Sequence, residues 1–214
     1  MLVLSGAWQT ISTTLGDYRA VLRIRNLRLL ALTRLCAFMI FYSSVIAIFE
    51  RSRGLDFTQI FLLESIISLA ALLFDVPTSV WADRIGYHWL LLLGRGLECV
   101  GMVIWIFSYG FWPFAFCSFL SGVSIACISG CEDALIASSV YAAQMEAGAD
   151  RHNAPSSGSA FALLGAASNV GFFLGLAFGS FMGAHNPVIP FAVTLAPLTA
   201  SVALTLALRP PAPS

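Results

Sequence analysis

The 214-residue sequence contains no lysine, and only 10% of its residues are charged. An ordinary soluble domain has about a quarter of its residues charged. The cationic side chains are 11 arginines, which 11 acidic side chains balance to a formal net charge of +0. Because no basic tail or patch can neutralise phosphates, the composition argues against a nucleic-acid partner.

Motifs for nucleotide binding and catalysis are also absent. The sequence has no Walker loop, which excludes nucleotide-driven transport within this chain. An intramembrane serine protease needs a Gly-x-Ser-Gly nucleophile, whereas Gly122-Val-Ser124-Ile lacks the final glycine, and the histidines fall at span ends or in loops. Without a nucleophile and a base, we predict no enzyme activity and no cofactor.

The cysteines and the N-terminal residues argue against a disulfide-bonded protein, a metalloprotein and a cleavable signal peptide. All five cysteines fall in apolar stretches, where free cysteine behaves as a small hydrophobe, so no disulfide framework is expected. Cys127 and Cys131, with Glu132 beside them, could hold a soft metal, but four ligands are not visible and packing explains them more simply. We predict no metal site. Residues 1–15 lack the pattern of a cleavable signal peptide.

Apolar residues dominate instead, at 58% of the chain with a mean hydropathy of +0.86. Each bilayer crossing takes about twenty apolar residues, so the length accommodates about six crossings and not the twelve of a full-size secondary transporter. The sequence predicts an all-α integral membrane protein. The six expected spans are residues 29–49, 60–81, 88–107, 111–140, 157–182 and 188–208.

The expected organisation is a lead-in over residues 1–26, a six-helix transmembrane domain over 27–208 and a tail over 209–214. The lead-in either lies along the inner headgroup layer as an amphipathic helix or is mostly solvated. Short cytoplasmic loops are enriched in arginine, which predicts that both termini are cytoplasmic in the cell (inner) membrane. The supporting arginines are Arg19, Arg23, Arg25, Arg28, Arg84, Arg151 and Arg209. Against them stand Arg51 and Arg53 in the first outer loop, accompanied by Glu50 and Asp56.

Ionisable side chains at membrane depth are costly, so each one is a candidate functional residue. Glu64 and Asp75 lie eleven residues apart in the second span, which returns a helix almost to the same azimuth, and Ser68 and Ser79 extend that stripe. Such a face must border a water-filled cavity or a partner helix.

The fourth span carries a second stripe, formed by Ser118, Ser121, Ser129 and Glu132, with Asp133 beside it. The third span adds Arg95 and Glu98, an i,i+3 pair that can neutralise itself or reach carboxylates on neighbouring helices. In the first span, Arg34 either snorkels to the inner surface or points into the same cavity.

These charges have two interpretations. They are either buried ion pairs that fix helix register or a cation or proton relay along a path. Five acids against two arginines leave an excess of three acids, so pairing cannot satisfy all of them. We expect at least one of Glu64, Asp75 and Glu132 to take part in proton or cation movement.

The link between the second and third spans contains Asp83-Arg84-Ile-Gly86, which resembles the signature of the major facilitator superfamily, Gly-x-x-x-Asp-Arg-x-Gly-Arg-Arg/Lys. Ser79 replaces the first glycine, and Tyr87-His88 replaces the basic pair. Residues 128–135 look like the end of the family's fourth helix. The resemblance covers residues 25–208 and corresponds to the N-terminal six-helix half.

The resemblance implies a 3+3 inverted repeat, alternating access, and a gate formed by Asp83, Arg84 and Gly86. In the family, the loop aspartate sits near a helix N-terminus of the opposite half. A second copy would supply that helix here, which places Asp83 near residues 157–159 of its mate. Residues Gly171, Gly175 and Gly179 form a Gly-x-x-x-Gly stripe that serves either such apposition or packing within one bundle.

We therefore expect a transporter that works as a homodimer or with a separate six-helix partner, exchanging a small solute. Proton-coupled efflux of an apolar or amphipathic compound is inferred from family analogy. Glu64, Asp75 and Glu132 would carry substrate cation or proton, and Arg34 and Arg95 would balance them. The alternative is a non-transporting or truncated membrane module that packs against and regulates another membrane protein.

Overall fold

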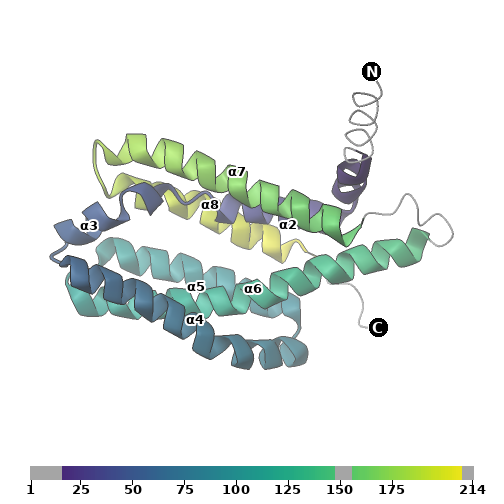
Figure 1. Ribbon diagram of the computed structural model, residues 1–214, viewed down its shortest axis with the longest axis horizontal. Helices are drawn as coiled ribbons and strands as arrows, with labels where there is room; N and C mark the ends of the chain where they lie inside the picture. The colour runs from purple at the N-terminus through teal and green to yellow at the C-terminus, as the bar shows by residue number, and fades with distance from the viewer. Residues whose placement is uncertain (1–15, 148–155, 209–214) are drawn as a thin grey trace, which may run out of the picture.

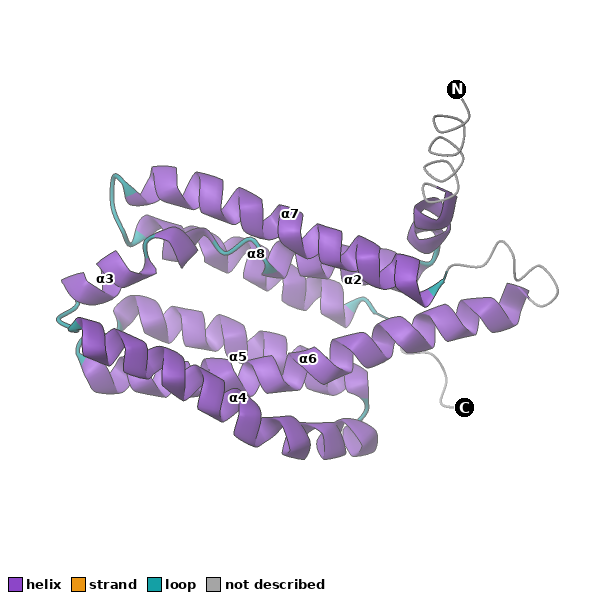
Figure 2. Ribbon diagram, in the orientation of Figure 1, coloured by secondary structure: helices purple, strands orange, loops and turns teal. Residues whose placement is uncertain are grey.

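A computed structural model describes residues 16–147 and 156–208 of the chain, and this part is helical without strands (Figures 1 and 2). The predicted tail, most of the lead-in, and Arg151 and Arg209 lie outside the described residues. Residues 16–23 are helical and run across the direction of the long helices. The following elements are α2 Arg25–Ala37, η1 Phe41–Ser44, α3 Ile46–Ser52, α4 Phe57–Ile85, α5 Tyr87–Phe107, α6 Phe111–Ala147, α7 Ser157–Gly183 and α8 Ile189–Leu206.

Six helical segments are long and apolar enough to cross a membrane, which confirms the all-α membrane fold. The first of them is Arg25–Ser44, which contains α2 and the 3-10 turn η1. The stretch predicted over residues 29–49 is therefore not one helix, because it is broken at η1 and its last residues belong to α3, beyond this span. No proline or glycine marks this break, so the sequence pattern could not show it. Irregular backbone at membrane depth is tolerated where protein covers it, and here α7 does so.

Glycines of α7 make that cover close. A Cβ atom added at Gly171 would collide with the carbonyl oxygen of Leu35, and one added at Gly179 would collide with that of Phe41. A Cβ atom added at Gly175 would also be too close to the backbone of Ile40, at 2.7 Å from its nitrogen. The Gly-x-x-x-Gly stripe is therefore used for packing within the bundle, and it is not the contact with a second copy that was the other alternative.

The helices form two groups that face each other (Figure 1). In one group α4 and α5 pack along α6, and in the other α7 and α8 pack along α2. The second span thus packs on the fourth, and the fifth packs on the first. This is the pattern expected of a 3+3 repeat, in which the first span corresponds to the fourth and the second to the fifth. Helix α5 also packs on α8 and joins the groups, whereas α2 and α6 approach each other over only a short stretch.

Apolar side chains form two separate cores. One contains Leu30, Leu91 and Ile136, and the other contains an aromatic cluster in which Phe49 contacts Phe114 and Phe191. Along α5, Leu91 belongs to the first core and Met102 to the second. The segment between them carries Arg95 and Glu98, so charged side chains lie between the two cores.

Candidate functional site

The site begins with Arg34, which projects from α2 toward α6. Its Nε atom lies 3.3 Å from Oε1 of Glu132, and its Nη2 atom donates a hydrogen bond to Oδ1 of Asp133 at 3.0 Å. Of the two positions expected for Arg34, the structure shows the one directed into the bundle. The two carboxylates are adjacent in sequence but differ in environment, with side chains 5% and 59% exposed.

A second arginine reaches the same glutamate from α5. Arg95, only 3% exposed, donates a hydrogen bond from Nη1 to Oε2 of Glu98 at 3.1 Å, and its Nη2 atom lies 3.6 Å from Oε2 of Glu132. Glu132 therefore sits between two arginines from different helices. We call the five residues the ion-pair chain; in order they are Asp133, Arg34, Glu132, Arg95 and Glu98.

The ion-pair chain is not fully hydrogen-bonded. Nε of Arg34, Nε and Nη2 of Arg95, and Oε1 of Glu132 are buried and make no hydrogen bond to other described residues. Two arginines against three carboxylates also leave one negative charge in excess. Buried charges are stabilising only when geometry and hydrogen bonding are good, so this cluster retains capacity to bind a proton, a cation or a polar group.

The predicted stripe on α6 does not share one environment. Glu132 and Ser118 are buried, whereas Ser129 is exposed. The hydroxyl of Ser118 makes no hydrogen bond within the described part of the chain. Only the Glu132 end of the stripe joins the ion-pair chain.

Glu64 and Asp75 lie apart from the ion-pair chain, on the exposed side of α4. Their companions Ser68 and Ser79 donate hydrogen bonds to the backbone carbonyls of Glu64 and Asp75, at 3.0 and 2.7 Å. The serine hydroxyls therefore bond to the backbone of their own helix and do not bond to either side-chain carboxylate. We call the face formed by Glu64, Ser68, Asp75 and Ser79 the α4 polar face.

The signature residues lie where α4 meets α5. Helix α4 continues to Ile85, so the expected loop is reduced to Gly86, whose φ of 99° is one that side chains other than glycine rarely adopt. Asp83 and Arg84 are exposed in the last turn of α4. Glycine is required here because the chain reverses within one residue.

The two residues that replace the basic pair of the signature have partners of their own. The hydroxyl of Tyr87 donates a hydrogen bond to Oδ1 of Asp83 at 2.7 Å. Nε2 of His88, which is buried, lies 2.8 Å from the carbonyl oxygen of Thr205 and links α5 to α8. Tyr87 thus contacts the preceding turn of the chain, whereas His88 contacts a distant helix.

Glu50 is a candidate that the sequence reasoning missed. The sequence analysis places it in the first outer loop with Arg51 and Arg53, but it lies in α3 with only 2% of its surface exposed. Its neighbour Phe49 is fully buried. Two successive buried positions followed by the exposed Arg51 give no periodic signal, so the pattern could not identify Glu50.

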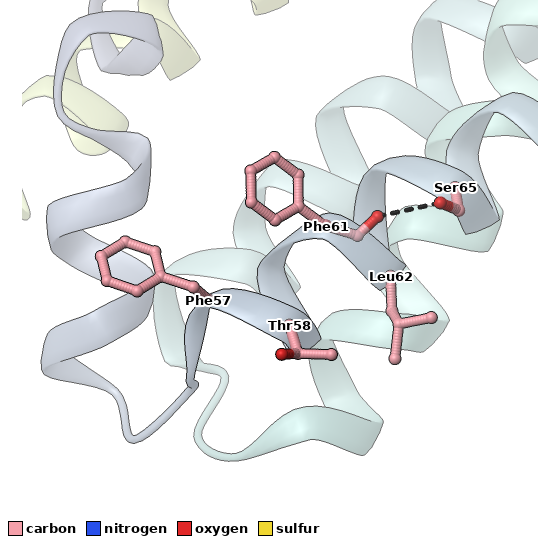
Figure 3. Close-up of a pocket in the computed structure, with 5 residues that line it drawn as sticks. All are labelled: Phe57, Thr58, Phe61, Leu62 and Ser65. Atoms are coloured by element: carbon pink, nitrogen blue, oxygen red, sulfur yellow. Dashed lines mark hydrogen bonds between the residues drawn. The ribbon is translucent and has the colours of Figure 1, made fainter.

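A hollow on α4, about 360 Å³ in volume, is separate from these charges (Figure 3). All its lining residues belong to the first turns of α4: Phe57, Thr58, Phe61, Leu62 and Ser65. The hydroxyl of Ser65 donates to the carbonyl of Phe61 at 2.9 Å. The hollow is mainly apolar and is not a candidate for binding a charged solute.

Cys127 and Cys131 are buried in the same apolar core as Leu91. In the described part of the chain, no group of three or more histidine, cysteine and acidic side chains is arranged to hold a metal ion. Packing therefore accounts for both cysteines.

Comparison with known proteins identifies a family. No curated protein matches the chain significantly. The sequence profile of the Major Facilitator Superfamily matches residues 29–214. This range includes the first span from residue 29 onward, the other five spans, the ion-pair chain and the Asp83–Gly86 signature. The chain therefore belongs to the Major Facilitator Superfamily.

Proposed function

We propose that the chain moves a small solute across the membrane by alternating access, coupled to protons and in the direction of efflux. Membership of a transporter family and six apolar helices support a multi-pass membrane transporter of this kind. The observation that carries the finer proposal is the ion-pair chain. It joins α2, α5 and α6 at the place where the two helix groups face each other.

Glu132 has the central role in this proposal. Its carboxylate is shared by Arg34 and Arg95 at 3.3 and 3.6 Å, so protonation would release both guanidinium groups at once. The released arginines would still hold Asp133 and Glu98. One proton could thus change the link between α2 and α5 without leaving an arginine unpaired, which is what a coupling site requires.

A second bundle is the next part of the proposal. Charged groups facing lipid cost a few kcal/mol each on insertion scales, and the α4 polar face is exposed in the single bundle. We propose that a second copy or a separate six-helix half covers this face. The end of α4, whose last turn contains Asp83, and the start of α7 lie at the same end of the bundle (Figure 1). There, Asp83 of one copy would approach residues 157–159 of its mate.

The membrane and the orientation follow from the arginines. We propose the cell (inner) membrane with both termini cytoplasmic, which places α3 and the start of α4 at the outer surface. We also propose that the chain has no enzymatic activity of its own.

The test is flux in vesicles that contain the purified full chain. A pH-sensitive dye inside and a panel of amphipathic fluorescent compounds would report coupled movement. We expect Glu132→Gln to lower proton-coupled flux at least tenfold. The matched control is Glu146→Gln, the same change at an exposed position of α6. Unchanged coupled flux in Glu132→Gln would refute the assignment.

The alternative function, a non-transporting module that regulates another membrane protein, is favoured by the same exposed α4 face. Helix α4 is the least buried of the six spans, with 17% of its apolar window inside the bundle. A regulatory partner would cover it as well as a second half would. Flux in vesicles that contain this chain alone supports transport, and its absence with every compound of the panel supports the regulatory module.

A further inference from the structure

The end of the bundle formed by α3 and the start of α4 carries a buried carboxyl group, that of Glu50. Phe49, the residue before it, packs against Phe191 with ring centroids 4.3 Å apart and against Phe114 at 6.2 Å. This packing holds α3 against the aromatic core. Glu50, next along the helix, is 2% exposed.

The arginines closest in sequence do not neutralise Glu50. The guanidinium of Arg51 lies over the ring of Phe57 at 4.5 Å. That of Arg53 lies 4.0 Å from the ring centroid of Tyr109 and donates a hydrogen bond to the carbonyl of Ile106 at 3.2 Å. Both cations are engaged with aromatic rings or backbone. Across residues 16–147 and 156–208, no ion pair or hydrogen bond reaches the Glu50 carboxyl.

The groups that do face Glu50 are acidic or neutral. Tyr42, in η1, interacts electrostatically with the carboxylates of Glu50, Glu64 and Glu98, which come from α3, α4 and α5. Of these three, Glu98 is paired with Arg95. Helices α6 and α8 contribute the uncharged rings of Phe114 and Phe191 to this end. Glu50 therefore has the Glu64 carboxylate as a neighbour and no partner cation.

We propose that Glu50 binds a proton from the water at the α3 end of the bundle. Proton binding converts its carboxylate into a neutral carboxylic acid, and release returns the proton to water or passes it on. The groups that follow inward are Tyr42 and Glu98, and Glu98 leads to Arg95 and Glu132. Glu50 is thus the first member of a line of ionisable groups that ends in the ion-pair chain.

The electrostatic environment supports this assignment. Burial, and to a lesser extent the nearby Glu64 carboxylate, raise the pKa of Glu50 to about 7 from a usual value of 4.5. The side chain is then neutral in mildly acidic water and charged in alkaline water. Its charged form, buried beside a second carboxylate, disfavours the packing of α3 on α4.

Glu50 can bind a proton whether or not the chain transports a solute, whereas a role for Glu50 in coupling protons to transport rests on the proposed function. The first measurement is therefore made without transport. Infrared spectra of the full chain in lipid nanodiscs are recorded against pH, and the carbonyl stretch of protonated carboxylic acids is followed. We expect a component that titrates near pH 7 in the natural chain and is lost in Glu50→Gln.

Two further variants make the assignment specific. Glu64→Gln removes the repelling carboxylate, so the midpoint of the Glu50 component should shift to lower pH. Asp56→Asn is the matched control, because Asp56 is an exposed carboxylate at the same end that caps α4 through Gln59. It should leave the component unchanged. Persistence of the component in Glu50→Gln, or a midpoint near the usual 4.5, would overturn the proposal.

Thermal unfolding gives a second readout that does not depend on the spectrum. The raised pKa of Glu50 means that its burial lowers stability progressively as pH rises from about 4.5 to about 7, and the loss persists above that range. Glu50→Gln should remove this decrease and melt at a higher temperature than the natural chain at pH 8. An unaltered pH dependence of melting would contradict the proposal.

Flux measurements then separate the two claims. If Glu50 titrates as expected but vesicles show no flux for the natural chain, the proposed function fails and the proton site stands. If flux is present and Glu50→Gln leaves its pH dependence unchanged, the coupling role of Glu50 is overturned.

Discussion

The acids of the membrane-spanning helices, which do not include Glu50, fall into two regions with different surroundings. Glu132 is buried and Glu98 is half-buried, and Arg34 and Arg95 form ion pairs with them. Glu64 and Asp75 lie on α4 and are exposed. The chain supplies counter-ions for Glu132 and Glu98, whereas no ion pair within the described residues reaches the carboxylates of the α4 polar face. In the proposed function, a second bundle covers that face.

The largest loss of stability is expected from removing the buried cation of the interior region, Arg95. Arg95→Ala leaves Glu98 without its hydrogen-bonded partner and Glu132 with only Arg34. Loss of one partner of a buried pair costs about 3–5 kcal/mol, so we expect a loss of that size in the free energy of unfolding. Unfolding with sodium dodecyl sulfate in mixed micelles measures it.

The matched control for this change is Arg84→Ala. Arg84 is exposed at the end of α4, so its removal should change stability by no more than about 0.5 kcal/mol. Equal losses of stability in the two variants would show that the buried ion pairs stabilise the bundle no more than an exposed arginine does.

The glycine stripe of α7 is a close contact without charged groups, and its loss should have the next largest effect on stability. Gly179→Ala places a methyl group against the carbonyl of Phe41, and overpacking of this kind costs about 1–3 kcal/mol. Gly165→Ala is the control, because a Cβ there meets nothing within 4 Å. Alanine at that position should be neutral or slightly stabilising, since it is the better helix former.

Unfolding measurements on these two glycine variants decide which surface the stripe serves. A loss of stability in Gly179→Ala alone places it within the bundle. If instead Gly179→Ala left stability unchanged and altered only the association of copies, the stripe would belong to an interface.

How far the sequence could predict this structure depends on whether a feature is local. The six spans are evident from apolar runs, and the Arg95–Glu98 pair from its i,i+3 spacing. The break after Ala37 has no local signal, because glycines more than 130 residues later shape it. The sharing of Glu132 by two arginines depends on how α2, α5 and α6 rotate toward one another, which spacing along one helix does not determine.

Substitutions in the signature show the same limit. The sequence shows Tyr87 and His88 only as replacements of the basic pair, because their contacts with Asp83 and Thr205 become evident only once α4, α5 and α8 are assembled. Glu50 was missed because arginines beside it suggested an exposed segment. Burial of a charged residue is a tertiary property, and it is the one that sequence patterns predict least well.

The α4 polar face should give the smallest effect on a single bundle. Asp75→Leu changes an exposed side chain, so the stability of the isolated bundle should change by no more than about 0.5 kcal/mol. Association of copies in lipid, followed by energy transfer between labelled chains on dilution, should weaken about tenfold, equivalent to about 1.4 kcal/mol. Unchanged association together with a more stable bundle would mean that this face borders lipid.

The most direct test of the account is the number of chains in the active particle. Native mass spectrometry of the full chain in lipid nanodiscs would be combined with flux measurements on the same preparation reconstituted in vesicles. The account predicts active particles with two copies of the 23.0 kDa chain, in which the α4 polar face is covered. A particle with one copy that still transports would contradict it.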